Sequence, residues 1–240
     1  MREHFDALAS RATASLTGSE QVTAWYSGEN SDFIRLNQGR VRQAGAVHQH
    51  TLTLRLISEG RHATSSMRLS GDETDHAQVD GALKNLRKLV AVLPADPFLL
   101  VDETPHARSD GETPQLVSPA ELTNALLDTA EDLDLVGIVA SRTMSRGFAS
   151  SFGARCWSES GGWHADWCLV HDADRAVKGS LAGTDLNSAA LKTKMAGMRQ
   201  QLDVLARPPR TVPPGAVRAW LGPAAVEEIL GLLSWGAFSG

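Results

Sequence analysis

Two histidines with a spacing suited to metal binding stand in the first quarter of the chain. Only Gln49 separates His48 from His50, so a strand would place both imidazoles on the same face. Such a pair could form half of a metal site, although the neighbouring sequence supplies no evident third ligand. Paired histidines are also common on strand surfaces that bind no metal. We expect a surface strand here, with a metal pair as the alternative.

The two cysteines flank a glycine-containing segment that predicts a hairpin turn. Cys156 and Cys168 stand on either side of residues 158–162, so across such a hairpin their thiols would face each other. A disulfide or half of a metal site is one interpretation. Two reduced thiols packed in a strand pair, as is usual in cytosolic proteins, is the interpretation that we favour. His164 and His171 flank Cys168 but stand too far apart along a strand to form a clear site.

Acidic residues cluster twice, and neither cluster requires a catalytic role. Asp72, Glu73 and Asp75 open a predicted helix, where the helix dipole favours negative charge. The second cluster, residues 131–134, contains three carboxylates and is typical of a solvated turn.

Three tryptophans stand close together in the second half of the chain. Trp157 and Trp167 could pair across the predicted hairpin, and cross-strand aromatic pairs stabilise a sheet by about 0.2–1 kcal/mol. Together with Trp163 they could form a stacking surface for an extended peptide. A structural cluster in the core or at an interface is the interpretation that we favour.

Motifs that identify an enzyme class directly are absent. The sequence contains no glycine-rich phosphate-binding loop, no Gly-x-Ser-x-Gly elbow and no His-Glu-x-x-His. The residues alone therefore assign no catalytic, cofactor-binding or metal-ligating position.

The elements that must position these residues are helices interleaved with runs of strands. Apolar periodicity predicts helices at 5–16, 72–93, 118–132 and 187–205, and strands at 21–26, 32–37, 40–44, 50–57, 61–69, 136–143, 147–152, 154–159 and 163–171. Turns at 37–39 and 58–60 join neighbouring strands, and Ser118 to Glu121 forms a capping box. This order predicts an α+β fold, in which antiparallel sheets are covered by helices.

Composition favours an ordinary soluble protein. The chain has 240 residues, of which 42% are hydrophobic and 21% charged. Its net charge of −5 argues against nucleic acid as the main partner. No apolar run approaches the length of a membrane span, and the charged start lacks a signal-peptide core. We expect a cytoplasmic protein with no membrane partner.

A proline-rich segment predicts a domain boundary. Four prolines stand between Pro208 and Pro214, where neither a helix nor a sheet can continue. We expect residues 1–206 to form the first domain, residues 207–215 a linker, and residues 216–240 the beginning of a second, β-rich domain. That beginning would consist of a strand at 216–221 and an apolar helix from Pro223. Because little sequence follows to cover this helix, we expect the chain to be a fragment.

Two segments resemble the TldD/PmbA family of peptidase-related proteins, also called modulators of DNA gyrase. Residues 32–44 are similar to the family's early hairpin, and residues 213–230 to the strand and helix that open its C-terminal domain. The resemblance extends in order over the whole chain. It implies a two-subunit cytoplasmic protease that acts on unfolded or precursor peptides. In the catalytic subunit, His-Glu-x-x-x-His on the opening helix binds zinc, and its glutamate serves as general base.

The corresponding helix departs from that catalytic motif. Residues 223–228 read Pro-Ala-Ala-Val-Glu-Glu and contain neither histidine. Glu227 and Glu228 do not stand where the motif's glutamate would, near Ala224. The resemblance therefore implies a noncatalytic PmbA (TldE) type subunit without a catalytic residue, cofactor or metal of its own. Zinc is expected only in a TldD-like partner, with which this chain would form a heterodimer acting on peptides. The alternative is a stand-alone peptide-binding or protein-interaction domain without protease activity.

Overall fold

The computed structural model describes residues 1–110, 115–172 and 175–237. The chain divides into two compact units, Met1–Ala206 and Arg207–Gly240.

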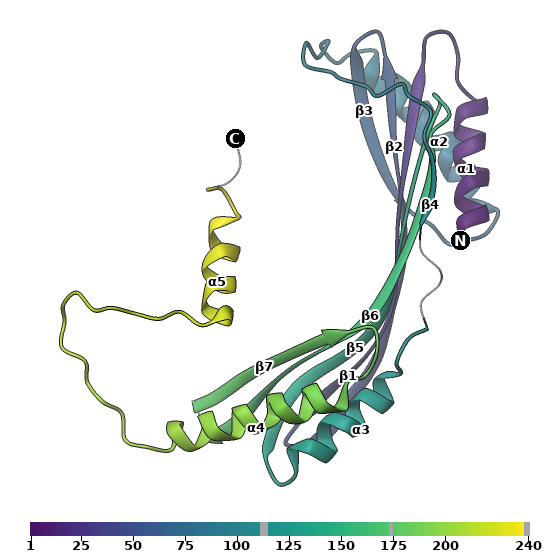
Figure 1. The fold of residues 1–240 in the computed structure, drawn as a ribbon. Coiled ribbons are helices and arrows are strands. Elements are labelled where there is room, and N and C mark those ends of the chain that lie inside the picture. The colour runs from purple at the N-terminus through teal and green to yellow at the C-terminus, as the bar shows by residue number, and fades with distance from the viewer. Residues whose placement is uncertain (111–114, 173–174, 238–240) are drawn as a thin grey trace. The chain divides into compact units, whose positions relative to one another are not determined.

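The first unit is built on a seven-stranded sheet (Figure 1). The strands pair in the order β3-β2-β1-β5-β6-β4, and β7 also pairs with β6. All pairs are antiparallel except β4 with β6. The strands are β1 (Gln21–Asn37), β2 (Arg40–Ser58), β3 (Arg61–Arg68), β4 (Ala107–Asp110), β5 (Asp134–Ser150), β6 (Arg155–Asp172) and β7 (Arg175–Gly183).

Four strands are longer than the sequence predicts, because predicted neighbours merge. Each of β1, β2, β5 and β6 takes in two of the predicted strands, and the hairpin expected at 158–162 is wrong. Glycines inside these strands allow close approaches instead of turns. A Cβ at Gly28 would lie 2.4 Å from the hydroxyl of Tyr26, and one at Gly45 would lie 2.6 Å from the ring of Phe33.

The two predicted hairpin turns are confirmed. Gln38 and Gly39, between β1 and β2, have φ values of 51° and 64°. Glu59 and Gly60, between β2 and β3, have φ values of 50° and 72°. Two successive residues with positive φ are the signature of a type I′ turn, whose twist matches that of the strands it joins.

Four helices complete the first unit. They are α1 (Arg2–Ala14), α2 (Thr74–Val90), α3 (Pro119–Ala130) and α4 (Ser188–Leu205). The side chain of Ser118 accepts a hydrogen bond from the amide of Glu121 at 3.2 Å, which confirms the cap of α3. Asn187 caps α4 in the same way through the amide of Ala190 at 3.0 Å.

The helices pack on one face of the sheet, one pair at each end (Figure 1). The first core lies under α1 and α2 and includes Phe5, Leu8, Val22, Tyr26, Leu54, Leu83, Leu86, Ala149 and Trp157. The second core lies under α3 and α4 and includes Leu36, Leu126, Leu135, Val139, Trp163, Trp167, Leu169, Leu191 and Met195. β1, β5 and β6 contribute to both cores. The predicted α+β fold is confirmed.

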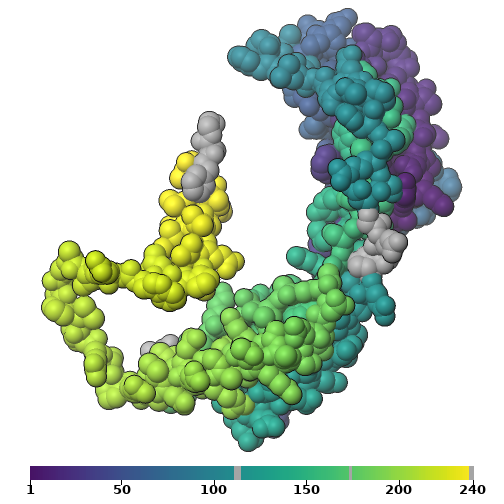
Figure 2. Space-filling model, viewed as in Figure 1, coloured from purple at the N-terminus to yellow at the C-terminus, as the bar shows by residue number. Residues whose placement is uncertain are grey.

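The second unit contains one helix, α5 (Pro223–Leu233), which begins where the sequence predicts. Residues 207–221 are exposed and run as a single thickness of chain (Figure 2). The strand predicted at 216–221 is wrong. Within residues 207–237 there is no second strand to satisfy the hydrogen-bonding groups of such a segment.

Across the described ranges, no helix has both the length and the apolar character that a membrane crossing requires.

Candidate functional site

The histidine pair of β2 lies on the helix-covered face of the sheet, and both imidazoles take part in hydrogen bonds. His48 Nδ1 lies 3.0 Å from Asn30 Oδ1, and His50 Nδ1 lies 2.8 Å from the hydroxyl of Tyr26. The prediction that both rings share a face is confirmed by their register against Asn30 and Gly28 of β1. In the part of the chain that the structure describes, no three His, Cys, Asp or Glu side chains gather as metal ligands.

Burial keeps the Tyr26–His50 contact uncharged at neutral pH. Tyr26 is fully buried, and this burial, with the nearby carboxylate of Glu159, raises the pKa of Tyr26 to about 12. Burial also lowers the pKa of His50, with smaller effects from the N-terminal amino group and His48. The two rings are nearly parallel, with an interplanar angle of 12°. The pair therefore serves the packing of the first core.

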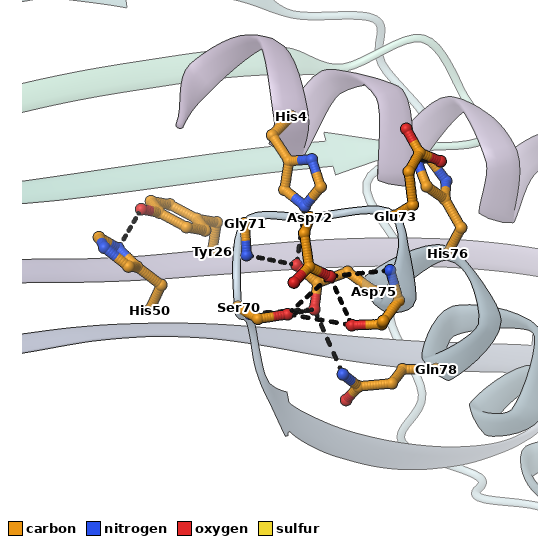
Figure 3. Close-up of polar contacts among 11 residues, drawn as sticks. His4, Tyr26, His50, Ser70, Gly71, Asp72, Glu73, Asp75, His76 and Gln78 are labelled. Atoms are coloured by element: carbon orange, nitrogen blue, oxygen red, sulfur yellow. Dashed lines mark hydrogen bonds and ion pairs between the residues drawn. The ribbon is translucent and has the colours of Figure 1, made fainter.

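The first acidic cluster contains a buried carboxylate, Asp75, at the start of α2 (Figure 3). Its oxygens accept hydrogen bonds from the amides of Ser70 (3.0 Å) and Gly71 (2.8 Å) and contact Nε2 of His4 at 2.8 Å. Burial acts to raise the pKa of Asp75, but these hydrogen bonds outweigh it and hold the pKa below its usual value. Asp75 thus ties α1 to the loop that precedes α2.

Ser70, His4 and Asp75 have the residue types of a catalytic triad but not its arrangement. The hydroxyl of Ser70 donates to Asp75 at 3.0 Å, whereas a triad requires the nucleophile to contact the imidazole. His4 in this arrangement does not accept a proton from Ser70. The cluster is structural, as the sequence predicts for its acidic residues. The buried position of Asp75 was not predicted.

The other acidic residues named from the sequence are exposed, including Asp72 and Glu73. Residues 131, 132 and 134 lie at the surface around a turn in which Asp132 has a φ of 57°, so the predicted solvated turn is confirmed. Glu227 and Glu228 are exposed on α5.

The cysteines do not face each other, because the hairpin expected between them is a continuous strand. Cys156 and Cys168 both belong to β6, and twelve residues of strand separate them by about 40 Å. Both thiols are free. His164 and His171 lie on the same strand, seven residues and about 23 Å apart, which is too far for them to share a site.

The three tryptophans of β6 belong to the cores, so the structural interpretation is confirmed and the predicted pair is wrong. Trp157 stacks on Tyr26 in the first core, with ring centroids 5.1 Å apart. Trp163 and Trp167 are buried in the second core. Within the sheet, Trp25 is the exposed tryptophan, at 53%, and its neighbours in the sequence did not indicate this.

Trp25 belongs to the opposite face of the sheet, which we call the helix-free face. Side chains alternate along a strand, and in the strands of the described first unit both cores take residues from the other face only. The central part of the helix-free face consists of Trp25, Ser27, Glu29, Ser31, Phe33 and Arg35 of β1 and Ile138, Ala140, Arg142, Met144, Arg146 and Phe148 of β5. This face is our candidate functional site.

An aromatic pair lies at one end of the helix-free face. The rings of Trp25 and Phe148 meet edge to face with centroids 5.8 Å apart. They line a shallow hollow of about 270 Å³ with Arg146, Ser158 and other residues. Such a site offers an exposed aromatic surface beside a cation.

A larger hollow of about 590 Å³ lies at the other end of the helix-free face. Its charged lining is mainly cationic and consists of Arg35, Arg42 and Lys178, with Asp166 as the acidic member. The guanidinium of Arg35 lies 5.7 Å from the ring centroid of Phe33, a cation–π contact.

Glu29 is the carboxylate in the middle of this face, and its oxygens are engaged. One accepts a hydrogen bond from Ser31 at 2.6 Å and the other from Gln49 at 2.9 Å. These two bonds, with smaller contributions from the charges of Arg142 and Arg146, lower the pKa of Glu29. Glu29 is therefore ionised at neutral pH and held in place.

No protein-family model and no curated protein sequence matches the chain. Solved structures with a similar fold include TldE from Thermococcus kodakarensis, with a TM-score of 0.66 and 15% identity over 83% of this chain and 47% of that one. Two proposed modulators of DNA gyrase are also similar. The protein from Thermotoga maritima has a TM-score of 0.53 and 13% identity over 82% of this chain and 47% of its own. The protein from Bacteroides thetaiotaomicron has a TM-score of 0.56 and 14% identity over 83% of this chain and 48% of its own.

The chain therefore spans about half the length of these proteins and shares their fold over most of its own residues. The sequence resemblance to the TldD/PmbA family is thus accompanied by a similarity of fold to TldE and to two proposed modulators of DNA gyrase.

Proposed function

We propose that this chain is the N-terminal part of a noncatalytic, TldE-like subunit of a cytoplasmic TldD/PmbA-type zinc metallopeptidase. The observation that carries the proposal is the similarity to TldE, with a TM-score of 0.66 over 83% of the chain. The resemblance of residues 32–44 and 213–230 to the same family is independent support, because it was found from the sequence alone.

The residues of this chain do not fit the zinc site of a catalytic subunit. α5 corresponds to the helix that carries His-Glu-x-x-x-His in such subunits, and Pro223–Leu233 contains no histidine. Within the described residues, no other three-ligand group replaces it. We therefore assign no zinc-dependent step to this chain and place the metal in a TldD-like partner.

The role that remains for this chain is to hold substrate and to contact the catalytic subunit. The helix-free face suits the first task, because it carries an exposed aromatic pair and a cationic hollow on a rigid sheet. A surface of this kind can form one wall of a channel through which an unfolded peptide reaches the partner's metal.

Co-expression with a TldD-like subunit that carries His-Glu-x-x-x-His tests the proposal. We expect the two chains to co-purify as a heterodimer and to cleave an unfolded peptide that neither chain cleaves alone. Cleavage should stop on chelation and return with zinc. The matched control replaces the motif's glutamate in the catalytic subunit by glutamine, which should preserve the complex and abolish cleavage. No complex and no gain in cleavage would contradict the proposal, as would chelator-sensitive cleavage by this chain alone.

A stand-alone peptide-binding domain is the second candidate. The exposure of Trp25, at 53%, favours it, since exposed aromatic side chains mark interaction surfaces. The same co-expression distinguishes the two candidates: a stand-alone domain would bind peptides without forming the heterodimer.

A further inference from the structure

Three arginines form a row along the centre of the helix-free face. Arg142 and Arg146 belong to β5, and Arg35 of β1 lies opposite Ile138 of the same strand. The row therefore advances by four residues at each step, from position 138 to 142 to 146. At the rise of an antiparallel strand, each step measures about 13 Å and the whole row about 27 Å.

Among the residues that the structure describes, none of these arginines forms an ion pair, although the ionised Glu29 lies between Arg142 and Arg146 and their charges act on it. Among the described residues, no Asp or Glu oxygen lies within 4.0 Å of any of the three guanidinium groups. Arg146 instead donates to the carbonyl of Ser145 at 3.0 Å, and Arg35 contacts the ring of Phe33. The chain as a whole carries a net charge of −5. The row places three cations against the single carboxylate of Glu29, a local positive excess that favours an anionic ligand.

Apolar side chains occupy the steps between the arginines, and in the step of Met144 they are joined by the ionised Glu29 of β1. Phe33 lies opposite Ala140, between Arg35 and Arg142, and Met144 lies between Arg142 and Arg146. The pair of Trp25 and Phe148 follows Arg146 at the same interval. Apart from Ser27, Glu29 and Ser31 of β1, cationic and apolar side chains thus alternate every two residues along the face.

This alternation matches the geometry of an extended polypeptide. A bound strand advances at the same rise as the sheet and presents every second side chain to it. Acidic side chains at every fourth position would meet the arginines, and apolar side chains midway between them would meet Phe33, Met144 and the aromatic pair. A nucleic acid strand carries one charge for about every 3.4 Å of its axis, so cations about 13 Å apart would leave most phosphates unmatched.

We propose that the helix-free face binds an extended acidic peptide segment with Asp or Glu at positions i, i+4 and i+8 and apolar residues at i+2, i+6 and i+10. Arg35, Arg142 and Arg146 receive the three carboxylates. This inference rests on the proposed function, and it names the class of peptide that the subunit selects.

Fluorescence anisotropy with the full chain and labelled eleven-residue peptides tests the inference. The first peptide carries the pattern, the second has the same composition with its three glutamates adjacent, and the third replaces the glutamates by lysines. We expect the patterned peptide to bind about tenfold more tightly than the rearranged one, and binding to weaken as salt rises. Equal binding of the first two peptides, or no binding of the first, would overturn the inference.

Matched variants connect this binding to the arginine row. The combination of Arg35→Gln, Arg142→Gln and Arg146→Gln should weaken binding of the patterned peptide by about tenfold or more. Lys84→Gln, Lys88→Gln and Lys192→Gln remove the same charge from exposed positions on α2 and α4, and should leave binding unchanged. Circular dichroism verifies that both triple variants fold. An equal loss in both would show an effect of overall charge only and would refute the assignment.

Two further measurements separate the alternatives. Tighter binding of a single-stranded oligonucleotide, lost in the arginine variant, would show a nucleic acid surface and overturn the inference. Because peptide binding is measured without the catalytic subunit, its failure beside an intact heterodimer refutes only this inference. Pattern-selective binding without a heterodimer refutes only the proposed function.

Discussion

The carboxylate of Asp75 contacts Nε2 of His4 at 2.8 Å and joins the first helix of the chain to the start of the second. We expect Asp75→Ala to lower the free energy of unfolding by about 3 kcal/mol, because it removes the buried acceptor shared by the amides of Ser70 and Gly71 and by His4. Urea denaturation measures the loss. Asp80→Ala is the matched control, since Asp80 forms an exposed pair with Arg11 on the same two helices. Its effect should be far smaller, and an equal loss would contradict the assigned role of Asp75.

The stabilisation by Asp75 should depend on pH. The pKa of Asp75 is lowered in the folded protein, so its contribution is complete above the ordinary value of 3.8 and is lost as the pH falls through the lowered native pKa. The difference in stability between wild type and Asp75→Asn should therefore be largest near neutral pH and shrink below about pH 4. Urea midpoints from pH 7 down to pH 3 measure this difference. A constant difference over that range would show that the charge does not matter.

The hydroxyl of Tyr26 occupies the space that a side chain at position 28 would need, so this position is glycine. A Cβ at this position would lie 2.4 Å from that oxygen, so we expect Gly28→Ala to destabilise the protein by about 1–3 kcal/mol. Combining it with Tyr26→Phe removes the nearest clash, and the double variant should lose less stability than the sum of the single variants. Gly81→Ala, on the exposed side of α2 with no atom within 4 Å of the added Cβ, should instead be stabilising. Additive losses in the double variant would contradict the proposed contact.

Substitutions of Trp25 and Trp167 should affect different properties, peptide binding in the first case and stability in the second. Trp167 is 1% exposed in the second core, and Trp167→Ala should cost about 3–5 kcal/mol. Trp25 is exposed, so Trp25→Ala should change the free energy of unfolding by about 0.5 kcal/mol or less. It should nevertheless weaken binding of the acidic peptide. Thermal unfolding and fluorescence anisotropy measure the two effects. Unchanged peptide binding by folded Trp25→Ala would remove the aromatic pair from the binding surface.

Two free thiols should be found in the protein without reducing agent. Because Cys156 and Cys168 belong to one strand and lie about 40 Å apart, no disulfide can join them within the chain. Thiol titration under denaturing conditions should give two thiols per chain, and the mass should be that of the reduced protein. A monomer whose mass is lower by two hydrogen atoms would contain a disulfide, which would contradict the continuous strand β6.

Features that depend on a few adjacent residues could be predicted from the sequence. The turn at Gln38 and Gly39 and the cap at Ser118 were recognisable because local conformation and hydrogen bonding determine them. Strand length was not predictable in this way. Glycine indicates a turn locally, yet Gly28 and Gly45 stay extended because neighbouring rings need their space.

The candidate site could not be predicted because it depends on register. The splitting of β6 into two strands placed Trp157 opposite Trp167, although they belong to different cores. Conversely, Trp25 and Phe148 are far apart in the sequence and meet only through the pairing of β1 with β5. The arginine row likewise combines both strands, so neither strand alone shows its spacing.

The continuity of β1, β5 and β6 through both cores has a consequence for how the chain folds. A slip of one residue between two strands would turn the core side chains outward and the arginines inward. On a short strand, such an error would affect only one helix pair. Here Val22 and Leu36 belong to the same strand but to different cores. The strand register that buries the residues of one core must therefore also bury those of the other. Each core thus constrains the strand register of the other, and a sheet paired in the wrong register would bury neither core.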